Sequence, residues 1–273
     1  MKGILNIGNS CYLNSAVQLL FNSKLFCSTL LSSTSNEPSI LLLKNNINKY
    51  HDTTNQIFIP NEIKSLVAHY APQFAGFSQE DSSEFIIYLF DIISKIAELD
   101  SNLCKQFKIT TTVNIKCKLT NCLHENEHNE YDMVLHLPIM ENLDEMYRKY
   151  KLSEIMENSY TCDKCNKNTI TRKKLITADW PNHLIIVLKR FENDLSKNSS
   201  RVKIPLQWRH NYKLQGGIVH MGGMGCGHYV YFGLVDNEWY IANDNNIIKI
   251  NDIVLNECLE NSYILYYAIS DTE

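Results

Sequence analysis

The 273-residue sequence predicts an α+β fold, and two observations carry that prediction. Residues 11 to about 100 are patterned mostly as helix, with apolar residues repeating every three or four positions. From Lys108 onward the chain changes to alternating β-branched and aromatic residues, which is typical of strands. Because the helical segments come first and the strands follow, the sequence indicates helices segregated from sheets.

The first expected helix begins at Cys11, directly after a short turn that contains Gly8. A thiol at a helix start lies beside partly positive backbone N–H groups, and a nearby imidazole would add to their effect, so we expect a lowered pKa. Far along the chain, Gly227-His228-Tyr229 supplies such an imidazole. The pairing of Cys11 with His228 indicates a cysteine protease. The apolar positions that support this helix are Leu13, Val17, Leu20 and Phe21.

A longer helix is expected over residues 85–96, where Phe85 opens a stripe of apolar residues at helical spacing. Ser78 and Asp81 are expected to form a capping pair ahead of it. Asp81 and Glu84 then fall at the helix start, where the helix dipole favours acids regardless of function. The expected strands that follow cover residues 109–113, 169–176, 183–188, 229–235 and 263–269.

Nine cysteines in a chain expected to be intracellular favour metal binding and a catalytic thiol over a disulfide framework. Two pairs, Cys117 with Cys122 and Cys162 with Cys165, supply the four thiolates of a closed tetrahedral site for structural Zn²⁺. The second pair has the spacing of a zinc knuckle. The first has four intervening residues, so His124 or His128 is an alternative to Cys117. Three other cysteines are expected in the core: Cys27, Cys104 and Cys258.

The net charge of −4 gives no basic surface for nucleic acid. Apolar runs such as Ile40 to Leu43 are far shorter than the roughly 18 residues of a membrane-spanning helix, and the N-terminus lacks a signal peptide's apolar core. No linker or repeat divides the chain. We therefore expect one catalytic domain, a soluble monomer that binds neither nucleic acid nor membrane and is located in the cytoplasm, the nucleus or both.

Five segments together resemble the ubiquitin-specific proteases, the papain-like cysteine deubiquitinases, in that family's order. Asn-x-Gly-Asn-Ser-Cys-Tyr-x-Asn-Ser-x-x-Gln is similar to the family's cysteine box, and Gln-x-Asp-x-x-Glu-Phe and Leu-x-Arg-Phe follow. Gly-His-Tyr resembles the histidine box, with a Trp-x-x-x-Asn-Asp segment behind it. In this chain the segments are 6–18, 79–85, 188–191, 220 with 227–229, and 239–244.

The resemblance implies a papain-like fold with a helical thumb, a β palm and zinc-tipped β fingers, and an active site between thumb and palm. Over the single domain of residues 1–273, it places the thumb at about 1–107, mainly fingers at 108–185 and mainly palm at 186–273. Zinc is then structural, and catalysis needs no cofactor.

The resemblance also implies roles for single residues. Cys11 is the expected nucleophile and His228 the general base. Asn243 is the first choice for the residue that orients His228, and its neighbour Asp244 is the rival. Asn6 is the expected side-chain donor of an oxyanion hole, with the Cys11 backbone N–H as its partner.

The implied substrate is ubiquitin, cleaved from lysine side chains of ubiquitinated proteins after its C-terminal Gly through an acyl-enzyme thioester. The substrate-binding residues expected from the boxes are Asp81, Glu84, Gly227 and Tyr229. A ubiquitin-binding pseudoenzyme and a protease for a ubiquitin-like modifier stay open as alternatives. A zinc-dependent nucleic-acid module is disfavoured by the acidic balance.

Overall fold

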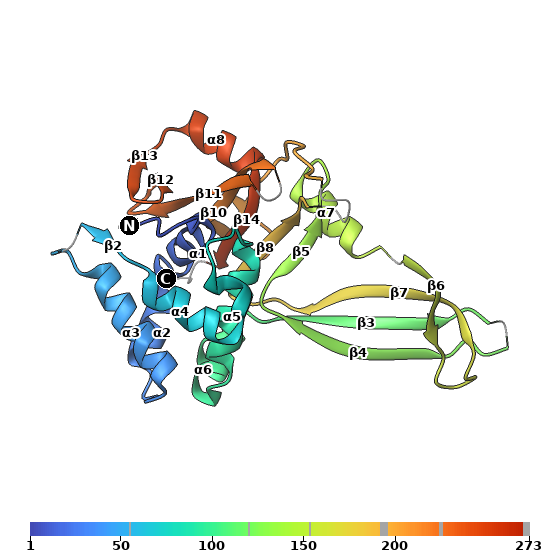
Figure 1. Ribbon diagram of the computed structural model, residues 1–273. Helices are drawn as coiled ribbons and strands as arrows, with labels where there is room; N and C mark the ends of the chain where they lie inside the picture. The colour runs from blue at the N-terminus through green and yellow to red at the C-terminus, as the bar shows by residue number, and fades with distance from the viewer. Residues whose placement is uncertain (55, 120, 153, 192–195, 224–225, 270–273) are drawn as a thin grey trace.

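The helices of the first third of the chain lie together on one side of the molecule (Figure 1). The computed structural model describes residues 1–54, 56–119, 121–152, 154–191, 196–223 and 226–269. Within these stretches, no helix combines the length and the apolar character needed to cross a bilayer. The elements of this layer are α1 (Cys11–Phe21), α2 (Lys24–Ser32), α3 (Pro38–His51), α4 (Asn61–Tyr70), α5 (Ser82–Ser94) and α6 (Ala97–Asn102), the short 3-10 helices η1 (Pro72–Ala75) and η2 (Cys104–Gln106), and the paired parallel strands β1 (Gly3–Ile4) and β2 (Ile57–Phe58).

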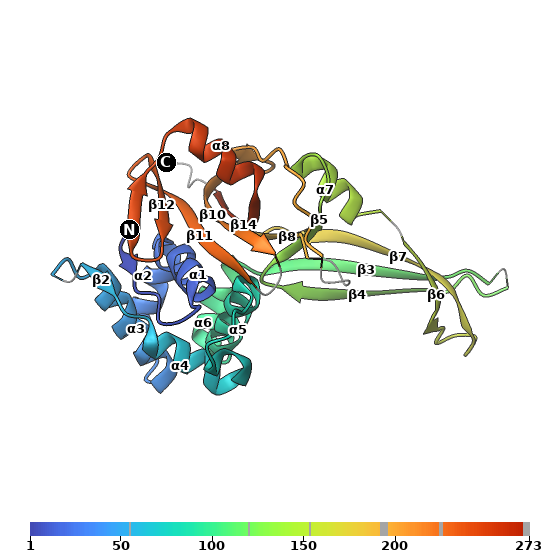
Figure 2. The same ribbon diagram turned by 45° about the horizontal axis from the view of Figure 1, so that its top comes forward.

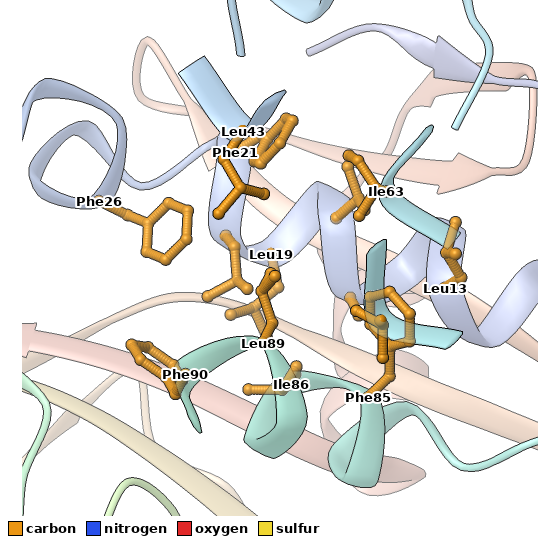
Figure 3. Close-up of a cluster of buried hydrophobic side chains, with 14 of the residues drawn as sticks. Leu13, Leu19, Phe21, Phe26, Leu43, Ile63, Phe85, Ile86, Leu89 and Phe90 are labelled. Atoms are coloured by element: carbon orange, nitrogen blue, oxygen red, sulfur yellow. The ribbon is translucent and has the colours of Figure 1, made fainter. Parts of the chain in front are cut away.

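Helix α1 lies at the centre of the molecule, and all eleven of its residues are buried. It packs against α5 and α2 on one side and against strands of the main sheet on the other. Leu13 and Leu19 of α1 face Phe85, Ile86 and Leu89 of α5 across this core (Figure 3). Because α1 is covered on every side, it presents no face to solvent, and even its polar residues are buried. The start of α1 is therefore held by packing from both layers.

An eight-stranded sheet follows, in the order β13-β12-β11-β10-β14-β8-β5, with β9 added beside β10. Its two faces carry different cores. Side chains such as Ile185 and Val187 pack with α1, whereas Leu184 and Ile186 pack with α7 and α8 on the opposite face. The elements are β5 (Leu135–Pro138), α7 (Leu143–Tyr150), β8 (His183–Lys189), β9 (Gln207–Trp208), β10 (Tyr212–Gly223), β11 (Cys226–Val235), β12 (Glu238–Asn243), β13 (Asn246–Lys249), α8 (Asp252–Glu260) and β14 (Ser262–Ile269).

A second sheet of four strands projects away from the helices and the main sheet (Figures 1 and 2). Its order is β4-β3-β7-β6, and every neighbouring pair is antiparallel. The cysteines predicted to bind metal lie at its far ends. The strands are β3 (Ile109–Cys117), β4 (Glu125–Asp132), β6 (Glu154–Thr161) and β7 (Asn168–Asp179).

The start of α5 differs from the expected capping pair. Asp81, and not Ser78, is the N-cap, because its carboxylate accepts hydrogen bonds from the backbone N–H groups of Ser83 and Glu84. The helix ends at Ser94, and Ile96, which continues the apolar stripe, is instead the N-cap of α6. The periodicity of the sequence runs across the break because both helices pack on one core.

Arg190, in the Leu-x-Arg-Phe segment, has a structural role. Arg190 as a residue is 2% exposed, and its guanidinium donates to four backbone carbonyls, those of Ser262, Asn198, Ser200 and Glu260. A buried charge needs such partners. Arg190 thereby fixes the end of β8, and the next residue, Phe191, is placed edge-on to His220 with ring centroids 5.1 Å apart.

Candidate active site

The turn before α1 closes on the side chain of Asn6. Its Oδ1 accepts hydrogen bonds from the backbone N–H of Gly8 at 3.1 Å and of Ser10 at 3.2 Å. Gly8 has a φ of +104°, and the ring of Phe77 lies 2.7 Å from where a Cβ would stand. Only glycine fits both constraints. The glycine of the cysteine box is therefore required by the shape of this turn.

Cys11 is the first residue of α1 and is 2% exposed. Its pKa is raised above the ordinary value, chiefly because burial disfavours the thiolate. The backbone N–H of Tyr229, which bonds to the sulfur, opposes that rise, and the charge of Asp244 adds to it. The expectation of a lowered pKa was therefore wrong for the free protein, since burial outweighs the helix-start N–H groups.

His228 and Asn243 meet on one face of the main sheet. Tyr231 pairs with Ala242, so Asn243 lies opposite Val230 and diagonal to His228. His228 Nε2 and Asn243 Oδ1 are 2.7 Å apart. Because a carboxamide oxygen only accepts, Nε2 carries the proton, and Nδ1 is left as the acceptor of the imidazole.

Asp244 does not continue the strand, because β12 ends at Asn243 and Asp244 has a φ of 51°. Its carboxylate accepts from Asn6 Nδ2 at 2.9 Å and from Asn14 Nδ2 at 2.7 Å. The two rival residues thus have different partners: Asn243 contacts His228, and Asp244 contacts the turn and helix of Cys11. The part of Asn14 was not foreseen, although it lies within the cysteine box.

Asp81 is enclosed by internal donors. One carboxylate oxygen caps α5, and the other accepts from Tyr229 at 3.2 Å and from Tyr263 at 2.6 Å. Burial and then the charge of Asp81 raise the pKa of both tyrosines, so both hydroxyls stay protonated. Tyr263 was missed from the sequence, because an aromatic residue in a strand reads as core.

A cavity of about 230 Å³ lies between the start of α5 and strands β10 and β11. Burial raises the pKa of Glu80 and of Glu84 in its wall. His220 is buried, its pKa is lowered to about 4 by that burial, and its Nδ1 has no hydrogen-bond partner among the described atoms. The cavity is lined by Gln79, Glu80, Asp81, Glu84, Phe191, His220 and Tyr229.

The four cysteines at the far ends of the second sheet converge, with all four sulfurs within 4.8 Å of one another. Cys117 belongs to this group, whereas His124 and His128 do not. In each pair the residue after the second cysteine, Leu123 or Asn166, has a positive φ. The longer first loop therefore still returns its second sulfur to the cluster. Four converging thiols suit a metal ion that prefers sulfur ligands.

Comparison with known proteins gives a family model described as "Ubiquitin carboxyl-terminal hydrolase", which matches residues 2–267. Two relatives from Arabidopsis thaliana are Ubiquitin carboxyl-terminal hydrolase 17, 28% identical over 97% of this chain and 41% of its own length, and hydrolase 25, 29% identical over 98% and 47%. Hydrolase 36 of Drosophila virilis is 25% identical over 98% of this chain and 26% of its own length. The chain thus spans less than half the length of these curated relatives.

Among solved structures, the SAGA DUB module of Ubp8, Sgf11, Sus1 and Sgf73 bound to monoubiquitin matches with a TM-score of 0.80 and 22% identity. The match covers 100% of this chain and 70% of that chain. The same module bound to ubiquitin aldehyde gives a TM-score of 0.79. At this identity the likeness is one of fold.

Proposed function

Because this chain belongs to the ubiquitin carboxyl-terminal hydrolase family, we propose that it is a thiol-dependent deubiquitinase. It cleaves the isopeptide bond between the C-terminal Gly of ubiquitin and a lysine side chain. The observation that carries the proposal is the contact of 2.7 Å between His228 Nε2 and Asn243 Oδ1. Tyr229, the residue after His228 on β11, bonds the sulfur of Cys11 through its backbone N–H.

The proposed chemistry follows from which nitrogen of His228 is free. Nδ1 takes the Cys11 proton while Nε2–H stays bonded to Asn243, and the sulfur attacks the Gly carbonyl carbon. His228 then gives that proton to the leaving lysine amine, and a thioester of Cys11 remains. Water attacks the thioester with His228 again as base, which releases the ubiquitin carboxylate and restores the thiol.

The negative oxygen formed in the attack needs preorganised donors. The first N–H groups of a helix lack intrahelical partners, so the Cys11 N–H is one candidate. Asn6 Nδ2 is the other: one of its hydrogens bonds Asp244, and the second is left for the substrate oxygen. Because the Asn6 oxygen is held by Gly8 and Ser10, the amide is fixed before substrate arrives.

We assign the acidic cavity beside Tyr229 to the basic C-terminal tail of ubiquitin. Glu80 and Glu84 both line this cavity, and burial disfavours their ionised forms, so a bound cation would stabilise the two carboxylates. Asp81 already accepts from two tyrosines and two backbone N–H groups. We therefore propose that Asp81 mainly shapes the wall of the cavity, and that Glu84 attracts the basic tail.

A panel of ubiquitin and ubiquitin-like proteins with C-terminal electrophiles tests the proposed function. Wild-type protein is expected to form a covalent adduct with the ubiquitin probe, and peptide mass spectrometry should locate it on Cys11. Adducts with only a ubiquitin-like probe would reassign the substrate. Binding of ubiquitin without any adduct would instead support the pseudoenzyme.

Separate tasks for Asn243 and Asp244 predict an order of effects. Asn243→Ala should lower kcat/KM more than Asp244→Ala, because only Asn243 orients His228 in this proposal. Asn6→Ala should lower kcat by about 10²–10³ with little change in ubiquitin affinity. Steady-state hydrolysis of a ubiquitin C-terminal fluorogenic amide measures all three.

A double-mutant cycle sharpens the same test. Combining Asn6→Ala with Asp244→Ala should cost little more than Asn6→Ala alone, since Asp244 acts by holding Asn6. Combining Asn243→Ala with Asp244→Ala should multiply the two losses. A larger loss for Asp244→Ala than for Asn243→Ala would transfer the orienting role to Asp244.

We propose that the cysteine cluster holds one structural Zn²⁺. Purified protein should then carry about one zinc per chain by elemental analysis, and Cys162→Ser should lose it. The cluster lies far from the proposed triad, at the end of the projecting sheet. Loss of the metal should therefore raise the rate of hydrogen exchange in β6 and β7 markedly and change kcat only slightly. Cys258→Ala, which removes a buried thiol outside the cluster, should keep the metal. Well-folded protein without zinc would contradict the assignment.

A further inference from the structure

Residues 77–82, which we name the brace, connect the two halves of the proposed active site. On the nucleophile side, Asn9 Nδ2 donates to the carbonyl of Phe77 at 2.8 Å. Ser82 Oγ donates to the carbonyl of Tyr12 at 2.9 Å, and this bond is buried. Asn9 and Tyr12 lie on either side of Cys11, so the brace is fixed to the segment that carries the nucleophile.

On the other side, Gln79 binds the strand that carries His228. Its Nε2 donates to the carbonyl of Gly227 at 2.6 Å, and its Oε1 accepts from the Gly227 N–H at 2.7 Å. One carboxamide thus satisfies both main-chain groups of the residue before His228. Two residues further along the brace, Asp81 accepts from the hydroxyl of Tyr229, the residue after His228, at 3.2 Å.

Gly227 can lie directly beside the ring of His220 because it has no side chain. A Cβ there would lie 1.8 Å from His220 Nε2, and His220 is itself packed at 4.6 Å between ring centroids against Tyr229. The strand is therefore confined by His220 and held by Gln79. A shift of the Gly227 backbone along the sheet would break both hydrogen bonds to Gln79.

We propose that Gln79 is a positioning residue, which sets the place of His228 relative to Cys11 by holding both main-chain groups of Gly227. The inference rests on the proposed function, in which His228 takes the thiol proton. Gln79, the first residue of the Gln-x-Asp-x-x-Glu-Phe segment, is thereby given the role of positioning the general base. A base displaced by about 1 Å slows proton transfer by about 10²-fold, which sets the scale of the effect.

The test measures Cys11 without ubiquitin. The rate of Cys11 alkylation by iodoacetamide is followed against pH in wild type, Gln79→Ala, Gln79→Glu and His228→Ala, together with kcat and KM on a ubiquitin C-terminal amide. Gln73→Ala on η1 is the matched control, because that side chain is exposed. Tm values show that each variant is folded.

Gln79→Ala is expected to slow alkylation at neutral pH by about tenfold and to lower kcat by about 10–100-fold, with KM within about twofold of wild type. Gln73→Ala should match wild type. Gln79→Glu should be slow at pH 7, where an ionised carboxylate faces the Gly227 carbonyl without a proton to donate. Relative to wild type it should recover as pH falls towards about 4–5, because a protonated carboxyl again offers one donor and one acceptor.

Three outcomes would overturn the inference. A raised KM with normal alkylation would make Gln79 a direct substrate contact. Normal alkylation and normal kinetics in a folded Gln79→Ala would make the couple incidental. If the alkylation rate of Gln79→Glu relative to wild type did not change with pH, the paired hydrogen bond would be excluded as the cause. If His228→Ala itself leaves alkylation unchanged, the proposed Cys11 and His228 pair fails first, and that result is distinct from all three.

Discussion

Cys11→Ala is expected to abolish hydrolysis of a ubiquitin C-terminal fluorogenic amide, with residual turnover below about 10⁻⁴ of wild type. The physical reason is that no other group in the proposed mechanism can form the thioester, so both the attack and the deacylation step disappear. The same variant should still bind ubiquitin, because the acidic cavity and the projecting sheet are untouched.

The fold should survive this change. Cys11 is buried, and loss of its sulfur leaves a small void costing about 1 kcal/mol of unfolding free energy. Cys258→Ala, another buried thiol on the opposite face of the main sheet, provides the control and should keep full activity. Substantial turnover by folded Cys11→Ala protein would refute the nucleophile.

His228→Ala is expected to have the second largest effect, a loss in kcat/KM of at least about 10³-fold. Without the base, only the thiolate fraction of Cys11 reacts, and burial raises the pKa of that thiol. Below that pKa the thiolate fraction grows tenfold per pH unit, so residual activity should climb steadily with pH, unlike the wild-type profile.

A matched control for this variant is His69→Ala, since His69 lies exposed on α4. It should leave both the rate and its pH dependence unchanged. Activity of His228→Ala that stays flat across neutral pH, at a level close to wild type, would exclude His228 as the acceptor of the Cys11 proton.

The sequence predicted the fold class and most of the elements because period and alternation are local properties. The strand expected at 183–188 is β8 at His183–Lys189, and the one at 263–269 is β14 at Ser262–Ile269. The helix start at Cys11 also agrees. Fold and family are confirmed by comparison, while the roles of the site residues stay proposals.

What sequence reasoning missed depends on contacts between distant segments. The direction of the Cys11 pKa is decided by burial, which a local view of the helix start does not include. The different partners of Asn243 and Asp244 follow from the positive φ at Asp244, which ends the strand at Asn243. The sequence alone does not show that the strand stops between these two residues. Gln79 and Gly227 are 148 residues apart, so their pairing has no local signal.

The complete burial of α1 has a consequence for how the protein loses activity. Partial openings in a protein start where few apolar contacts hold a segment, and the eleven residues of α1 are enclosed by both layers. From Asn14 onward, where the backbone N–H groups are bonded within the helix, its amide hydrogens should therefore exchange only by unfolding of the whole molecule. The nucleophile then belongs to the last structure to open, whereas the projecting sheet is free to fluctuate around its own contacts. Loss of the helix that carries Cys11 should therefore coincide with global unfolding, whereas local opening of the projecting sheet, at lower free energy, should leave that helix in place.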